Sequence, residues 1–313
     1  MKFGHWKKYL SIIGIALFIY IIIKIDFITI FETIRNADVF YLFIAFFFLG
    51  IMLVVQTLKW WIVALMQGIA ISFRDAFEIN IISNFYGFVT PSKAGGIVRA
   101  EYLRAYTPDK NIGKGLFNFT IDKILDFSSI AFMTILFSFV FKDKLDLPLS
   151  LFISIFFVFI LITLFFIDKE RSRFFLRFFY KRIIHDKYKD TAKITFNSFY
   201  ENIPKKRYFA LFFVFSLVSW MIIYAIIYFI GLSLGIALSF EYYLAILPIG
   251  TIVGMLPISI AGLGTREAAL ISLFGLFDVE AAKVFSMSLI NIFLVGIFPS
   301  IIGIYLIIKR KNR

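Results

Sequence analysis

Apolar runs long enough to cross a membrane recur along this chain. A helix needs roughly 20 apolar residues to cross about 30 Å of hydrocarbon. The runs of that kind are 9–25, 40–67, 115–141, 147–167, 208–232 and 284–308. The first begins with lysines but has no small-residue cleavage site, and it ends at Lys24 and Asp26, so we interpret it as a span and not as a signal peptide. The pattern predicts an all-α polytopic membrane protein with about six full spans.

Two further apolar stretches, 76–106 and 242–276, are interrupted by helix breakers. These breakers are Pro91, Gly95 and Gly96 in the first stretch and Pro257, Gly262 and Gly264 in the second. A helix loses hydrogen bonds at such positions and must stop or bend. In lipid, broken backbone persists only where neighbouring helices or a water-filled cavity satisfy its polar groups. We therefore expect two re-entrant or broken helical hairpins, and the total becomes eight if these count as spans.

An internal repeat relates the two halves of the chain. Residues 68–73 read GIAISF and residues 235–240 read GIALSF, an offset of 167 residues. The same offset carries 40–67 onto 207–234, Arg99 onto Arg266, and 115–141 onto 282–308. We expect one transmembrane domain, 1–313, with repeat unit one at about 40–141 and repeat unit two at about 207–308. An odd number of crossings separates equivalent points, which predicts an inverted repeat, the common plan of secondary transporters.

Composition excludes a soluble globular domain and several kinds of chemistry. The chain is 61% hydrophobic and 17% charged, with a mean hydropathy of +0.90, whereas soluble domains are about 45–50% apolar and about 25% charged. The absence of Cys excludes disulfides, thiolate metal sites and thiol nucleophiles. The two histidines, His5 and His185, lie far apart in the sequence. We therefore expect no metal site and no cofactor.

The basic residues predict the orientation of the chain. Of 33 Lys and Arg, 23 fall at the two termini, beside the first hairpin and in the linker 168–207, and 5 fall on the opposite face. This asymmetry predicts cytoplasmic N- and C-termini. The linker interleaves basic residues with Phe and Tyr, which is typical of a helix on an anionic leaflet and not of nucleic-acid binding. The remaining five basic residues lie at membrane depth: Lys59, Lys93, Arg99, Lys123 and Arg266.

Arg99 and Arg266 occupy matching places after the clustered glycines. The N-terminus of a half-helix presents free N–H groups and partial positive charge, and a guanidinium can hold a phosphate through two parallel hydrogen bonds. The two arginines could therefore bind a phosphate-bearing headgroup, with one arginine facing each side of the membrane. Alternatively, Arg99 pairs with Glu101 or Asp122, and Arg266 with Glu267 or a buried carbonyl, and these pairs only fix the hairpins.

Other polar residues at membrane depth complete the candidate site. Asp122 and Asp126 are four residues apart and share a helix face, where they could couple protons or cations to transport, or neutralise Arg99 and Lys93. Asn84 should lie near the first hairpin's tip with Lys93, and either bridges broken backbone or contacts substrate. The predicted substrate-binding set is Arg99, Arg266, Lys93, Asn84, Glu101, Glu267, Asp122, Lys123 and Asp126, with no catalytic residue.

Two motifs resemble the signature of one family. Residues 91–103 read P-x3-G-G-x-x-R-x-x-x-L, and residues 256–268 read L-P-I-S-I-A-G-L-G-T-R-E-A. They resemble the lysylphosphatidylglycerol synthase transmembrane region, whose members are also described as flippase-like integral membrane proteins. The stretch 122–126 is similar to the family's Glu-Arg-x-x-Asp, with Lys123 in place of Arg, which weakens any bidentate role at that position. Because nothing follows Arg313, we do not expect the soluble aminoacyl-transferase domain or its chemistry.

The resemblance implies a translocator in the prokaryotic plasma membrane. We expect a lipid flippase that moves an anionic phospholipid or a lipid-linked glycan by alternating access between the inverted repeats. A membrane scaffold that recruits a transferase through 168–207 is an alternative. A lipid-phosphate enzyme using Asp122 and Asp126 is another, although such chemistry usually needs a metal or a positioned base.

Overall fold

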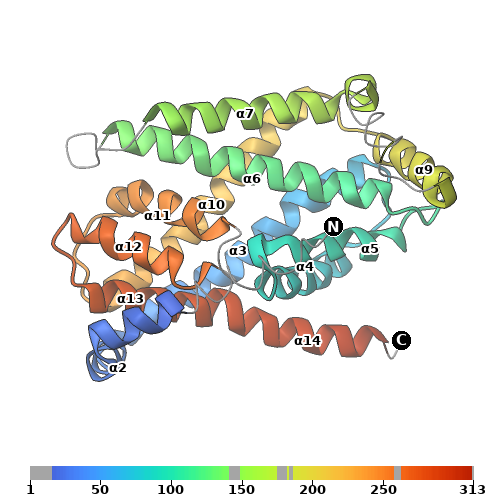
Figure 1. Cartoon of the computed structure of the whole chain (residues 1–313). Helices are drawn as coiled ribbons and strands as arrows, with labels where there is room; N and C mark the ends of the chain where they lie inside the picture. The colour runs from blue at the N-terminus through green and yellow to red at the C-terminus, as the bar shows by residue number, and fades with distance from the viewer. Residues whose placement is uncertain (1–15, 141–148, 175–181, 183–185, 257–261, 312–313) are drawn as a thin grey trace.

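The computed structural model describes residues 16–140, 149–174, 182, 186–256 and 262–311, and this part of the chain forms helices and no strand (Figure 1). Pro257 and most of the stretch RFFLRFFYKRII lie outside the described residues.

The helices follow one another along the chain in two halves. The first half contains Ala16–Ile25, α2 (Phe27–Arg35), α3 (Val39–Met66), α4 (Phe73–Phe88), the 3-10 helix η1 (Pro91–Ile97), α5 (Val98–Arg104), α6 (Gly113–Val140) and α7 (Leu149–Ile167). The second half contains α9 (Lys189–Phe199), α10 (Arg207–Ser233), α11 (Phe240–Met255), α12 (Thr265–Gly275), α13 (Ala281–Asn291), the π-helical segment η4 (Ile292–Ile297) and α14 (Phe298–Lys311).

Three of the described helices are long and apolar enough to cross a membrane: α3, α10 and the continuous run from α13 to α14. The predicted segments 115–141 and 147–167 fall on α6 and α7, which run side by side (Figure 1). The all-helical class with membrane-length helices is confirmed. The number of crossings and the orientation of the termini stay predictions.

Helix boundaries recur at the offset found in the sequence. α4 and α11 begin at 73 and 240 and end at 88 and 255, and α5 and α12 begin at 98 and 265, each pair 167 residues apart. The loops before α4 and α11 also match, because Gly68 and Gly235 both have positive φ, at 73° and 70°. α3 and α10 pack against each other and run in opposite directions (Figure 1).

Side chains satisfy the broken backbone of the first hairpin. Thr90 donates a hydrogen bond to the carbonyl of Tyr86 at 2.7 Å and accepts one from the N–H of Gly95, also at 2.7 Å. Ser83 donates to the carbonyl of Gly96 at 2.8 Å. A Cβ at Gly95 would collide with the carbonyl oxygen of Tyr86, so only glycine fits there. These contacts replace helical hydrogen bonds where water is absent.

The second hairpin breaks between α11 and α12. Gly262 and Gly264 have φ of 79° and 80°, a region that side chains rarely adopt, so these predicted breaker positions require glycine. The tip of the first hairpin, η1, contacts α11. The two broken segments therefore meet inside the bundle.

Each hairpin packs against the helix that ends the other predicted repeat unit. α4 lies along α14, and α11 lies along α6 (Figure 1). Gly303 lets α14 approach α4, because a Cβ at that position would sit 2.9 Å from the Cβ of Phe85. The two halves are thus interlocked around the hairpin tips.

Candidate functional site

A cavity of about 240 Å³ lies where the two hairpins meet, with walls from α3, α4, η1, α5, α6, α10, α11, α12, α13 and η4. All five basic residues that the sequence places at membrane depth line it: Lys59, Lys93, Arg99, Lys123 and Arg266. Asn84, Asp122 and Asp126 from the predicted set line it as well. The structure therefore gathers most of the predicted polar residues around one space.

An ion cluster joins α3, α5 and α6, formed by Lys59, Arg99, Asp122, Lys123 and Asp126. The Lys59 Nζ lies 2.7 Å from Asp122 Oδ1 and 2.5 Å from Asp126 Oδ1. The Nη2 of Arg99 lies 2.9 Å from the other oxygen of Asp122, Oδ2. Lys123 is the loosest member, with its Nζ 3.4 Å from Asp126 Oδ2 and 37% of its side chain exposed. Asp122 thus pairs with Arg99, as one of the two interpretations expected, but the main partner of both carboxylates is Lys59, and neither forms an ion pair with Lys93.

Arg99 is held between an acid and two aromatic rings. Its guanidinium lies over the ring of Trp60, 4.9 Å from the centroid, and over that of Phe119 at 5.6 Å. Its acidic partner is Asp122 and not Glu101. Glu101 is exposed, pairs with Arg104 at 3.2 Å, and is not among the residues that line the cavity. The structure therefore does not bring Glu101 to the site.

Arg266 is fixed by its neighbour Glu267. The fully buried Glu267 carboxylate accepts from Arg266 Nη2 at 2.8 Å, from the Ser288 hydroxyl at 2.6 Å and, through its second oxygen, from the N–H of Gly264 at 2.6 Å. One side chain thus caps α12, ties it to α13 and neutralises an arginine that lines the cavity. Arg266 keeps 20% of its side chain exposed.

Glu267→Gln is expected to lower the free energy of unfolding by about 1.5–3 kcal/mol, because hydrogen bonds to a buried charged group are worth that much. Gln can still accept from the Gly264 N–H, but Arg266 loses its counter-ion. Thermal or denaturant unfolding of the purified protein in detergent measures the change. The control is Glu280→Gln, whose exposed carboxylate lies 3.9 Å from Lys283 and should leave unfolding unchanged. Equal stability of the two variants would contradict the role given to Glu267.

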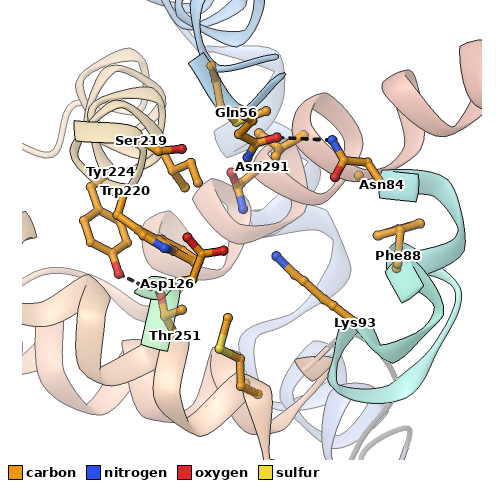
Figure 2. A pocket seen from close by; sticks show the side chains of 18 of the residues that line it. Gln56, Asn84, Phe88, Lys93, Asp126, Ser219, Trp220, Tyr224, Thr251 and Asn291 are labelled. Atoms are coloured by element: carbon orange, nitrogen blue, oxygen red, sulfur yellow. Dashed lines mark hydrogen bonds between the residues drawn. The ribbon is translucent and has the colours of Figure 1, made fainter. Parts of the chain in front are cut away.

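Lys93 differs from the other four basic residues. It lies in η1 with a positive φ of 55°, an uncommon conformation for a side-chain-bearing residue. Figure 2 shows its side chain pointing into the cavity toward Asp126 and Trp220, and its Nζ is 5.9 Å from the centre of the Trp220 ring. No carboxylate of the described residues forms an ion pair with it. Lys93 is therefore the cation most available to a ligand.

The cavity wall also contains uncharged polar residues that were not predicted from the sequence, among them Gln56, Tyr224, Thr251 and Asn291. Asn84 donates to Gln56 at 3.2 Å, and the Tyr224 hydroxyl lies 3.3 Å from that of Thr251 (Figure 2). Asn291 lines the cavity directly before the π-helical segment, a feature frequent at functional sites. Gln56 was detectable as a polar residue within an apolar span, whereas Tyr224 and Thr251 carry no such signal. Backbone bridging falls to Ser83 and Thr90, not to Asn84.

Charged groups in the cavity favour an anionic ligand. Five basic residues line it, against the carboxylates of Asp122 and Asp126 and that of Glu267 beside Arg266. No group of three or more His, Asp and Glu able to hold a metal ion occurs in the part of the chain that the structure describes.

Two comparisons place the chain among known sequences. Residues 10–303 match the family described as lysylphosphatidylglycerol synthase TM region, so the match includes both hairpins and the cavity. The chain is also similar to a UPF0104 membrane protein of Methanothermobacter thermautotrophicus, with 24% identity over an alignment that covers 94% of this chain and 91% of that protein.

Proposed function

This chain belongs to the lysylphosphatidylglycerol synthase transmembrane-region family, and from that premise we propose that it is a lipid flippase of the cell membrane. It moves the headgroup of an anionic phospholipid or lipid-linked glycan through the cavity, while the hydrocarbon chains stay in the surrounding lipid. The observation that carries this proposal is the convergence of five membrane-depth basic residues on one cavity.

The cost of placing charge in a membrane supports an anionic cargo. A basic side chain at the bilayer centre costs at least about 2.5–3.5 kcal/mol unless it is paired or hydrated. Four of the five basic residues have acidic partners within 4.0 Å, and Lys93 has none among the described residues. A passing anionic headgroup would supply the missing partner, and Lys93 points toward the space that it would occupy (Figure 2).

Inverted repeats give the movement a mechanism. The recurring helix boundaries, the opposed directions of α3 and α10 and the reciprocal packing of α4 on α14 and α11 on α6 support two inverted units at about 40–141 and 207–308. Separation of α4 from α14 would open the cavity to the cytoplasmic side, where both termini lie. Separation of α11 from α6 would open it to the opposite side.

Individual residues take different parts in this mechanism. Lys93 and Lys123 contact the headgroup directly, because their side chains keep exposed surface in the cavity wall. Arg266, partly exposed and held by Glu267, faces it from the second unit. Arg99 is buried and instead fixes Asp122.

Flipping in proteoliposomes tests the proposal. Fluorescent short-chain phosphatidic acid and phosphatidylglycerol are placed in both leaflets. A membrane-impermeant reductant bleaches the label in the outer leaflet, and the slower loss of the remaining fluorescence gives the rate at which labelled lipid moves from the inner to the outer leaflet. Lys93→Gln should slow flipping by about tenfold, equivalent to losing about 1.4 kcal/mol of charge contact. Lys193→Gln, an exposed lysine of α9, is the control and should match the unchanged protein. Rates equal to those of protein-free vesicles would overturn the proposed function.

A further inference from the structure

The charges around the cavity do not cancel. The ion cluster contains three basic side chains, Lys59, Arg99 and Lys123, but two carboxylates. The pair Arg266–Glu267 is balanced. Lys93 adds a further cation, so the cavity carries an excess of two positive charges.

That excess sits on two ammonium groups that face open space. Within the ion cluster, both carboxylates lie within 2.7 Å of Lys59, and Asp122 is also held by Arg99. Lys123 lies farther from both carboxylates, with its Nζ 3.4 Å from Asp126 Oδ2 and 3.9 Å from Asp122 Oδ2, and it keeps 37% of its side chain exposed. Lys93 is exposed within the cavity wall and points inward (Figure 2). The surplus therefore belongs to Lys93 and Lys123, whose like charges repel each other.

We propose that the cavity selects a lipid whose headgroup carries two negative charges, a phosphomonoester or a diphosphate esterified at both ends, over a singly charged phosphodiester. A phosphate monoester carries about −1.5 to −2 charges at pH 7, which matches the surplus, whereas one phosphodiester would leave a positive charge unpaired. Lysine suits such a group, because its compact ammonium binds phosphate as a point charge without requiring a planar fork. The inference rests on the proposed function only in taking the ligand to be a lipid.

Equilibrium binding to the full-length protein in detergent tests this selectivity without any transport step. The probes are short-chain phosphatidic acid, farnesyl monophosphate, short-chain phosphatidylglycerol and short-chain phosphatidylcholine. Trp60 and Trp220 line the cavity, so tryptophan fluorescence reports occupancy. Phosphatidic acid and farnesyl monophosphate should bind at least about tenfold more tightly than phosphatidylglycerol, because the second desolvated charge contact is made only by the dianions. Whichever of the two binds more tightly identifies a glycerolipid or an isoprenoid as the natural carrier, and both results support the proposal.

Substitutions assign the selectivity to the two lysines. Lys93→Gln and Lys123→Gln should each weaken binding of the dianionic probes by about tenfold, with a smaller effect on phosphatidylglycerol. Lys93→Arg should keep most of the preference, because the charge remains. Lys193→Gln is the matched control that leaves all affinities unchanged.

Two outcomes separate this inference from the proposed function. Phosphatidylglycerol binding as tightly as both dianions would overturn the selectivity, even if proteoliposomes flip lipid. A clear dianion preference that the two lysine substitutions abolish would uphold the inference, even if no lipid is flipped. A preference that survives both substitutions would also overturn it, because the charge would then come from elsewhere.

Discussion

Replacing Lys59 by Met is expected to lower the free energy of unfolding by about 3–5 kcal/mol, the range seen when one partner of a buried ion pair is removed. Lys59 is buried in α3 and bridges Asp122 and Asp126 of α6 at 2.7 and 2.5 Å. Without Lys59, the remaining ion pair of Asp126 is the longer one with Lys123, at 3.4 Å. The two ion pairs by which Lys59 joins α3 to α6 are lost. Denaturant unfolding in detergent, followed by tryptophan fluorescence, measures the loss.

A double variant distinguishes charge imbalance from lost packing. Lys59→Met combined with Asp126→Leu removes one charge of each sign and leaves Arg99 paired with Asp122 at 2.9 Å, so it should recover most of the stability. Lys283→Met is the control, because its ammonium lies 3.9 Å from an exposed carboxylate and contributes little. If the single variant is as stable as the control, the ion cluster does not stabilise the fold.

Local chemistry made the broken hairpins predictable. Proline and clustered glycine mark positions where a helix cannot continue, and α4 ends at Phe88, shortly before Pro91. Gly264 directly precedes α12 with a positive φ, as a breaker should. The offset of 167 residues found in the sequence also separates the start of α4 from that of α11, and the start of α5 from that of α12. Each of these signals depends on a few neighbouring residues, which a sequence displays directly.

Pairing across helices was not predictable in the same way. Lys59 and its two acidic partners are more than 60 residues apart, and their contact depends on how α3 crosses α6. Glu101 looked like a partner for Arg99, but residues two apart on a helix face different directions, and Arg99 instead turns toward Asp122. Glu267 does contact its neighbour Arg266, because it folds back to cap Gly264. Side-chain direction, not sequence distance, decides these pairs.

A disulfide between α4 and α14 is expected to abolish flipping, the largest functional effect that the proposed mechanism predicts. In the proposed mechanism the two helices belong to different units, and they separate when the cavity opens to the cytoplasm. Asp75 and Glu78 of α4 hold Arg310 of α14 at 3.4 and 3.2 Å near one end of this contact. Farther along, a Cβ at Gly303 would lie 2.9 Å from that of Phe85. A disulfide needs about 3.5–4.5 Å between these atoms, so a small outward shift lets Phe85→Cys and Gly303→Cys join.

Reversal by reductant gives this prediction its control. The chain has no Cys, so the two introduced thiols are the only ones that can react. The double variant should flip lipid when reduced and stop when oxidised, whereas each single variant should respond to neither treatment. Since the closed contact already exists in the structure, oxidation should leave the folded protein intact. The oxidised protein should therefore unfold no more easily than the reduced one, and this result would distinguish a locked gate from a damaged protein. Full flipping with the disulfide formed would mean that α4 and α14 move together, and the cavity would then have to open along another contact.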